Sequence, residues 1–154
     1  MQTFLPYKSF ARSAACLDNK RLGKQRVEAM QILDILCTKH KKKLGQTDYR
    51  AWSNHPAVLQ WEGHEGVLFS YLQDICAEWI KRGFNNNGMD RHLQRLSDSY
   101  HLISKHLTAP SWLGNRAFHA SYKSRLLQKD LAFYSKYKWK VPLDLEYYWP
   151  VRKQ

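Results

Sequence analysis

The 154-residue sequence predicts a compact all-α fold in one domain. Apolar residues recur at three- to five-residue steps over several long stretches, which is the spacing of amphipathic helices. Glycine and proline stand between those stretches, and no internal repeat or low-complexity tract divides the chain. The length suits one domain with a real core, and the apolar share of 44% is typical of a globular protein. We therefore expect a single domain over residues 1–154.

The first half of the chain predicts two helices and a connection. Residues 13–37 are expected to form a helix because their apolar positions follow helical spacing: Leu22, Val27, Met30, Leu33 and Leu36. Residues 38–53 carry a lysine cluster without periodicity, which predicts a connection whose lysines lie either in solvent or against phosphates. Asn54 is expected to cap a short helix that starts near Pro56.

Three further helices are expected in the second half. A long helix follows Gly63 and stops before Gly83, a typical C-terminal glycine. The run "NNNG" at residues 85–88 predicts a loop, and Asp90 is expected to cap a helix that continues to about residue 107 and ends before Pro110. Residues 116–130 predict the last helix, with cations on its polar side.

The charge balance favours a polyanionic partner. Lys and Arg outnumber Asp and Glu by 25 to 13, a formal net charge of +12. Such an excess repels itself, so it favours nucleic acid or an anionic membrane surface as partner. No apolar run reaches the roughly 20 residues that span a bilayer, and the N-terminus lacks the order of a signal peptide. We expect a cytoplasmic protein with no membrane partner.

Cysteines and histidines predict no metal site and no cofactor. The cysteines are Cys16, Cys37 and Cys76, an odd number without a C-x-x-C pair, and we expect reduced, packed thiols. The seven histidines form no H-E-x-x-H pattern. Patterns of the GxGxxG or P-loop type are absent, which counts against nucleotide-driven chemistry. A Cys–His nucleophile stays open, although nothing selects one of the thiols.

Aromatic rings alternate with cations in the last 24 residues. One interpretation is nucleic-acid binding, because rings stack on exposed bases while cations hold phosphates. The other is that the rings simply cover the core of a small domain; the residues concerned are Phe133, Tyr137, Trp139, Tyr147 and Trp149. The sequence leaves both open.

The stretch "LDNKRLGKQRVEA", residues 17–29, surrounds one glutamate with cations. On a helix Arg21, Lys24 and Glu28 share a face by the i, i+3, i+7 rule. An ordinary surface ion pair at this spacing contributes only a few tenths of a kcal/mol. The alternative is that Glu28 is held there for chemistry, and the spacing alone does not decide.

Four blocks, taken in order, make the whole chain resemble the pyrimidine-dimer DNA glycosylase/AP lyase family, the phage endonuclease V type and its bacterial relatives. The blocks are "MQTFLPY" at the N-terminus, "LDNKRLGKQRVE" ending on Glu28, "SNHPAVLQW" followed by "AEWIKRGF", and "HASYKSRLL" followed by the aromatic tail. The resemblance implies a compact helical domain. It also implies a monomer that binds DNA, in particular a duplex carrying a lesion or a modified base.

The resemblance further implies a mechanism based on the N-terminal amine. That amine attacks the sugar C1′, releases the base and forms a Schiff base, after which β-elimination cuts the strand. Because Gln2 is bulky, we expect Met1 to be retained and to supply the amine, and Glu28 matches the family's essential acid. An α-amine of pKa about 7.7 to 8.0 keeps a usable neutral fraction, whereas lysine near about 10.4 keeps almost none. A carboxylate beside it can relay protons and stabilise positive charge on the sugar.

The DNA contacts that we expect on this basis are Gln2, Lys20, Arg21, Lys24, Arg26, His55, His119, Lys123 and Arg125. Gln2 stands where the family has an arginine, and Val27 replaces the arginine before the glutamate, for which Arg26 is the expected substitute. Two other function classes stay open. One is an enzyme that alters or exchanges a modified base without strand cleavage, and the other is a DNA-binding module that has lost turnover.

Overall fold

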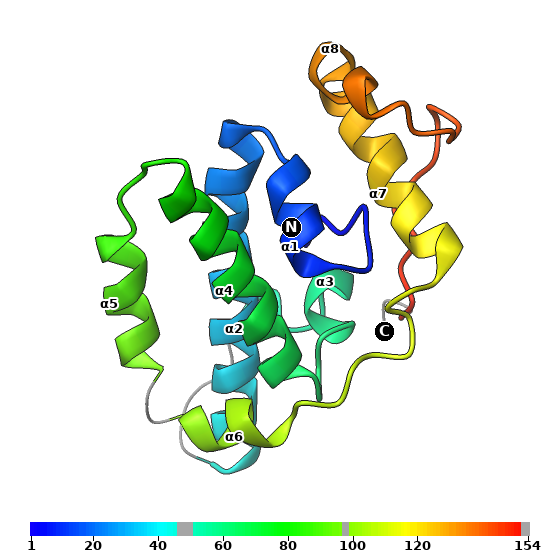
Figure 1. The fold of residues 1–154 in the computed structure, drawn as a ribbon. Coiled ribbons are helices and arrows are strands. Elements are labelled where there is room, and N and C mark those ends of the chain that lie inside the picture. Colours follow the sequence, from blue (N-terminus) through cyan, green and yellow to red (C-terminus); the bar gives the residue numbers. More distant parts are fainter. Residues whose placement is uncertain (46–50, 97–98, 152–154) are drawn as a thin grey trace.

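The computed structural model describes residues 1–45, 51–96 and 99–151, and within these ranges the chain forms helices and no strand (Figure 1). In chain order the helices are α1 (Phe10–Cys16), α2 (Asn19–Lys43), α3 (Pro56–Leu59), α4 (Glu65–Lys81), α5 (Asn87–Arg95), α6 (Tyr100–Lys105), α7 (Arg116–Lys129), α8 (Leu131–Tyr134) and the 3-10 helix η2 (Ser135–Tyr137). The predicted all-α class is confirmed.

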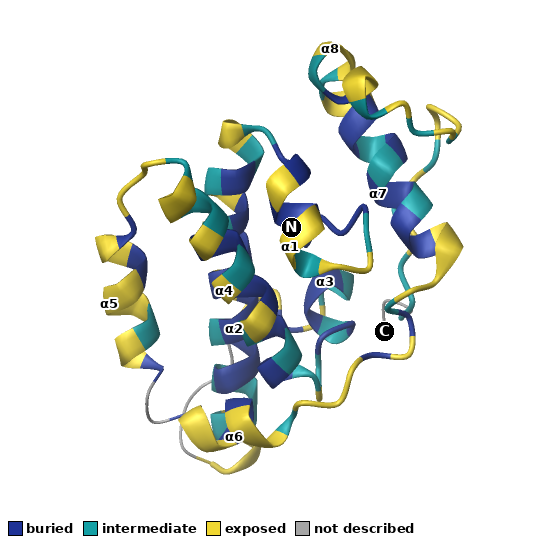
Figure 2. Cartoon of the chain, viewed as in Figure 1, coloured by how far each residue is buried: buried dark blue, intermediate teal, exposed yellow. Residues whose placement is uncertain are grey.

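Helices α2 and α4 lie side by side, with α5 on one flank and α1 and α3 on the other, and α7 lies beyond α1 and α3 (Figure 1). Buried residues gather where these helices and the N-terminal segment meet (Figure 2). The largest fully buried side chains are aromatic: Trp61, Tyr71, Tyr122 and Tyr134. The chain after η2 returns along α7, so the C-terminal tail covers that helix.

The predicted helix over residues 13–37 is wrong at both ends. The chain forms α1 and α2 instead, separated by Leu17 and Asp18 in extended conformation. The Tyr134 hydroxyl accepts the Asp18 N–H at 3.1 Å and donates to the Asp18 carboxylate. The Asp18 N–H therefore bonds Tyr134, from the far end of the sequence, instead of a backbone carbonyl of the preceding helical turn.

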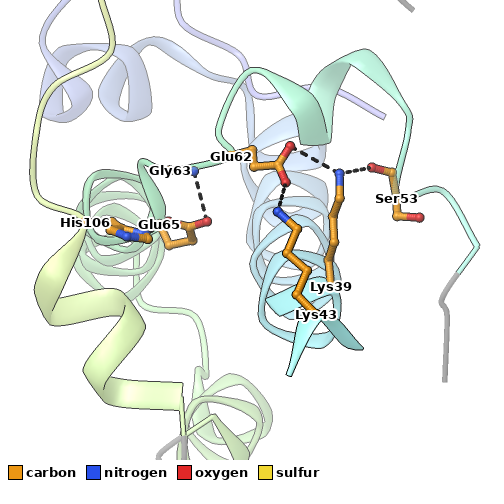
Figure 3. A network of polar contacts seen from close by, with 7 residues as sticks. All are labelled: Lys39, Lys43, Ser53, Glu62, Gly63, Glu65 and His106. Carbon is orange, nitrogen blue, oxygen red and sulfur yellow. Dashed lines mark hydrogen bonds and ion pairs between the residues drawn. The ribbon is translucent and has the colours of Figure 1, made fainter. Parts of the chain in front are cut away.

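Helix α2 also continues to Lys43, through lysines predicted to lie in a connection. Lys39 and Lys43 stand one turn apart on α2, and each places its ammonium 3.2 Å from a Glu62 oxygen (Figure 3). The shared carboxylate offsets the repulsion between the two lysines, which favours continuing the helix. The helix ends before Gly45, whose φ of 72° suits glycine. Residues 46–50 of the predicted connection lie outside the described residues.

The predicted ends of α4 and α7 are confirmed, whereas those of α3, α5 and α6 are corrected. The cap of α3 is His55 rather than Asn54, because His55 Nδ1 accepts the Ala57 N–H at 3.0 Å. The helix expected from Asp90 to about residue 107 is two helices, α5 and α6, and residues 97–98 between them are not described. Helix α5 starts inside the predicted "NNNG" loop, and α6 ends well before Pro110.

The three cysteines are free and buried, which confirms the predicted packed thiols. The tail rings named above are all half-buried against the core, so the core-covering interpretation holds for them. Across residues 1–45, 51–96 and 99–151, no three potential metal ligands of the His, Cys, Asp or Glu type cluster. No helix in the described part of the chain combines the length and apolarity needed to cross a membrane.

Candidate active site around Glu28

The first five residues run through the interior outside any helix, and distant side chains hold them there. Thr3 Oγ1 accepts hydrogen bonds from Trp61 Nε1 at 3.1 Å and from Gln60 Nε2 at 3.3 Å. The Leu5 carbonyl lies 2.7 Å from His119 Nδ1 on α7. The N-terminus is therefore anchored by contacts with α7 and with the end of α3.

Gln25 on α2 connects the N-terminal segment to Glu28. Its Oε1 accepts the Phe4 N–H at 2.9 Å, which fixes the amide orientation. Its Nε2 donates to the Gln2 carbonyl at 3.0 Å and to Glu28 Oε2 at 3.2 Å. Gln25 is fully buried, so water does not compete for these bonds. One amide group thus joins the backbone next to Met1 to the Glu28 carboxylate.

Tyr71 on α4 completes this arrangement. Its hydroxyl lies 2.6 Å from Gln25 Oε1 and 2.9 Å from the Phe4 carbonyl, so two acceptors share one proton. Burial raises the pKa of Tyr71 well above its usual value, and the group stays a neutral donor. The Gln25 side chain therefore has partners at both its oxygen and its nitrogen.

Glu28 is buried but not enclosed by cations. Only 8% of the residue is exposed, and its Oε1 lies 3.6 Å from the Lys24 ammonium, whose side chain is mostly exposed. Arg21, on the same face of α2, is paired with Asp18 at 3.2 Å. The carboxylate is thus held by one neutral amide and one loosely placed lysine.

The end of α7 and the C-terminal tail carry further groups whose electrostatics involve Glu28. The Arg125 guanidinium lies 4.7 Å from the centre of the Tyr147 ring. Burial raises the pKa of Tyr147, with Arg125 opposing and Glu28 adding to the shift. Partial desolvation, and then Arg21 and Arg125, lower the pKa of Lys129, which Glu28 opposes. Tyr147 is one of the tail rings that the sequence left open between base stacking and core covering. Lys129 was not predicted, although it stands one turn after Arg125, a spacing that could have indicated it.

Three of the predicted DNA contacts face other partners. Arg26 stacks 4.6 Å from the centre of a Trp79 ring, on the side of α2 away from Glu28. A Cβ on Gly23 would lie 3.0 Å from the same tryptophan, so this glycine lets α4 pack closely. His55 caps α3, and its ring centre lies 5.9 Å from that of Trp149. Lys123 lies roughly 200° around α7 from Arg125, which is two residues further on.

His119 is a structural contact in this geometry rather than a group presented to a ligand. The residue is buried, its Nδ1–H donates to the Leu5 carbonyl, and its Nε2 accepts the Gly114 N–H at 2.9 Å. Gln2 is also buried, while Lys20 is exposed. Of the predicted contacts, Lys24 pairs with Glu28, Arg21 shares its face of α2, and Arg125 lies over the Tyr147 ring of the tail.

A sequence model of the family described as pyrimidine dimer DNA glycosylase matches residues 1–92, which include the N-terminal segment, Gln25 and Glu28. The match covers more than half of the chain. The chain belongs to this family. Comparisons with curated proteins and with solved structures gave no significant match. Membership in the pyrimidine dimer DNA glycosylase family makes this a DNA-repair glycosylase by family, and α7 and the tail lie beyond the matched residues.

Proposed function

We propose that the chain excises a damaged or modified pyrimidine base from DNA and then cuts the abasic strand by β-elimination. The Met1 amine is the nucleophile and Glu28 the acid–base group. One observation carries this proposal: the Gln25 amide bonds both the Gln2 carbonyl and the Glu28 carboxylate, so the first residues are anchored beside a buried acid. An amine and an acid held together in this way can act on one sugar.

The chemistry begins with attack of the Met1 nitrogen on C1′. As that bond forms, the bond from C1′ to the base breaks, and Glu28 takes the amine proton and passes it to the departing base. The C1′–O4′ bond then breaks, O4′ takes the second amine proton, and an imine joins the Met1 nitrogen to C1′. Glu28, free again as a carboxylate, accepts a C2′ proton, and the bond from C3′ to its phosphate oxygen breaks with release of the phosphate. Water finally hydrolyses the imine and restores the amine.

The cations around Glu28 hold the strand while this happens. Lys24 on α2 lies 3.6 Å from the Glu28 carboxylate, and α7 contributes Arg125 and Lys129 as further cations. They suit the phosphates on either side of the reacting sugar. The target nucleotide must leave the stack to reach Glu28, at a cost of a few kcal/mol that is least at a lesion.

Borohydride trapping tests the proposal directly. Reduction during reaction with an abasic duplex is expected to fix a covalent protein–DNA adduct, and peptide mapping is expected to place it on Met1. A chain carrying a short uncleaved N-terminal extension is the control, because it moves the amine while leaving the basic surface intact. An adduct on Lys24 or Lys129 would replace Met1 as nucleophile and keep the lyase. Base release without strand cleavage or adduct would contradict the lyase step.

A further inference from the structure

A basic pocket of about 420 Å³ lies between the N-terminal segment and α7. Four cations line it: Lys8, Arg116, Lys123 and Lys140. Tyr7 and His119 also contribute to its wall. The pocket therefore combines residues from the N-terminal segment, from α7 and from the C-terminal tail.

The pocket lies on the face of α7 opposite Arg125 and Lys129. Arg116 and Lys123 are seven residues apart and share one stripe of the helix. Arg125 and Lys129, whose charges act on the Glu28 site, lie roughly half a turn away from that stripe. A group bound in the pocket thus meets a different face of α7 from the one that carries Arg125 and Lys129.

The charge in the pocket is uncompensated. No acidic residue lines it, and none of its four cations forms an ion pair with a residue in the described part of the chain. Arg21 and Lys39, by contrast, are paired with Asp18 and Glu62. Four like charges around one hollow repel each other, and a bound anion would offset that repulsion.

The walls of the pocket are held in place before any ligand arrives. Two cations lie over the Tyr7 ring, the Arg12 guanidinium 4.1 Å and the Lys123 ammonium 5.1 Å from its centre. The Tyr7 hydroxyl accepts the Trp139 Nε1–H at 2.9 Å. Burial and then the Arg12 charge lower the pKa of Lys123, as expected for an ammonium without a counter-ion.

Gly114 lies in the wall of the pocket beside the Lys8 side chain. Its φ of 99° suits glycine, and a Cβ there would lie 3.4 to 3.7 Å from atoms of the Lys8 side chain. The Gly114 N–H donates a hydrogen bond to His119, which fixes this turn to the wall of the pocket. Arg116 is the first residue of the 14-residue helix α7, so the positive N-terminal end of the helix dipole lies beside the pocket.

We propose that this pocket binds a phosphate group outside the Glu28 site, carried by the backbone of a second stretch of the bound DNA. The proposal rests on the proposed function only in taking DNA as the ligand. Three of the four cations are exposed at the rim, namely Lys8, Arg116 and Lys140. Exposed lysine and arginine side chains are typical of contacts to a phosphate backbone, whereas small-molecule sites are mostly enclosed and apolar.

The test compares two triple variants of the full chain with equal charge loss. The pocket variant is K8Q/R116Q/K140Q, and the control is K81Q/R91Q/K105Q, three exposed cations on other helices without an ion pair in the described residues. Affinity for an abasic duplex is measured against salt concentration. In the log-log plot, the pocket variant is expected to lose about 0.9 of slope for each phosphate contact removed, and the control much less. Equal slopes in the two variants would overturn DNA as the ligand.

A second measurement separates the two sources of phosphate. Inorganic phosphate is titrated into the protein while the backbone amides of Gly114 and Ala120 are followed by NMR. Saturable shifts that vanish in the pocket variant support the phosphate site. If the shifts are seen but the two triple variants have equal salt slopes, the phosphate that the pocket binds belongs to a free phosphate compound and not to DNA. No shift together with equal slopes would overturn the proposal. Neither readout requires excision, so a failure of the proposed chemistry leaves this test intact.

Discussion

The two halves of α2 carry similar charges and use them differently. Near the C-terminal end, Glu62 from the following segment lies 3.2 Å from both Lys39 and Lys43 (Figure 3). Burial opposes ionisation of Glu62, but the two lysines outweigh it and lower the pKa of the carboxyl. This acid is paired with cations on both of its oxygens.

Glu28, in the N-terminal half, is held in another way. Its second oxygen bonds a neutral amide, Gln25, which is itself bonded to the backbone of Gln2 and Phe4. Its one lysine partner lies 3.6 Å away with an exposed side chain. An acid fixed by a neutral group keeps its charge available to a ligand, whereas an acid closed by two lysines stabilises the fold. In the proposed function, Glu28 therefore serves chemistry, whereas Glu62 pairs with the lysines at the other end of α2.

The largest effect is expected from Glu28→Gln. The substitution keeps the shape and the Gln25 contact but removes the proton carrier, and such losses typically cost ~10²–10⁴ in rate. Single-turnover excision is therefore expected to fall by that factor, while melting temperature and DNA affinity change little. Glu62→Gln is the matched control, and its excision rate is expected to stay normal. Near-normal excision by the Glu28 variant would leave the acid as an ordinary ion-pair partner.

The next largest effect is expected from Gln25→Leu. The Phe4 N–H would lose its buried acceptor, and one such unsatisfied group costs about 1–3 kcal/mol. The free energy of unfolding, measured in urea, is expected to fall by at least that amount, and excision is expected to fall because the N-terminus is released. The matched control is Gln31→Leu on the exposed side of α2, which is expected to stay within about 0.5 kcal/mol of the parent. Equal losses in the two variants would contradict the anchoring role.

The contrast within α2 also shows what the sequence could predict. Helical spacing predicted α4, α7 and the common face of Arg21, Lys24 and Glu28, because these depend on neighbours within two turns. It missed Gln25, whose partners Phe4 and Tyr71 lie 21 and 46 positions away.

The errors in helix boundaries have the same cause. The break at Asp18 depends on Tyr134, and the extension of α2 through Lys43 depends on Glu62. Contacts between residues far apart in the sequence decided both positions, and local patterns do not contain them.

A smaller effect is expected from pH at His119, which anchors the other end of the N-terminal segment. Burial lowers the pKa of His119 below its usual 6.5, although the bond to Leu5 opposes the shift. The unfolded chain then binds more protons than the folded one, so the free energy of unfolding falls as pH drops below about 6.5. Protonation would also leave the Gly114 N–H without an acceptor. In urea titrations from about pH 7.5 to 5.5, His119→Gln is expected to show less of this dependence. An unchanged dependence would assign it to other histidines, such as His40.

The smallest effect is expected from Glu62→Gln, and it sharpens the comparison from the structural side. One lysine partner is mostly exposed, so the two ion pairs together are expected to contribute about 1 kcal/mol or less to the free energy of unfolding. Because the folded pKa of Glu62 is lowered, the contribution is present above its ordinary value of 4.5 and is lost as pH falls through the folded value. Urea unfolding of parent and variant is therefore expected to differ slightly at neutral pH and to converge in acid. A difference of several kcal/mol, or one that persists in acid, would mean that Glu62 stabilises the fold by something other than its charge.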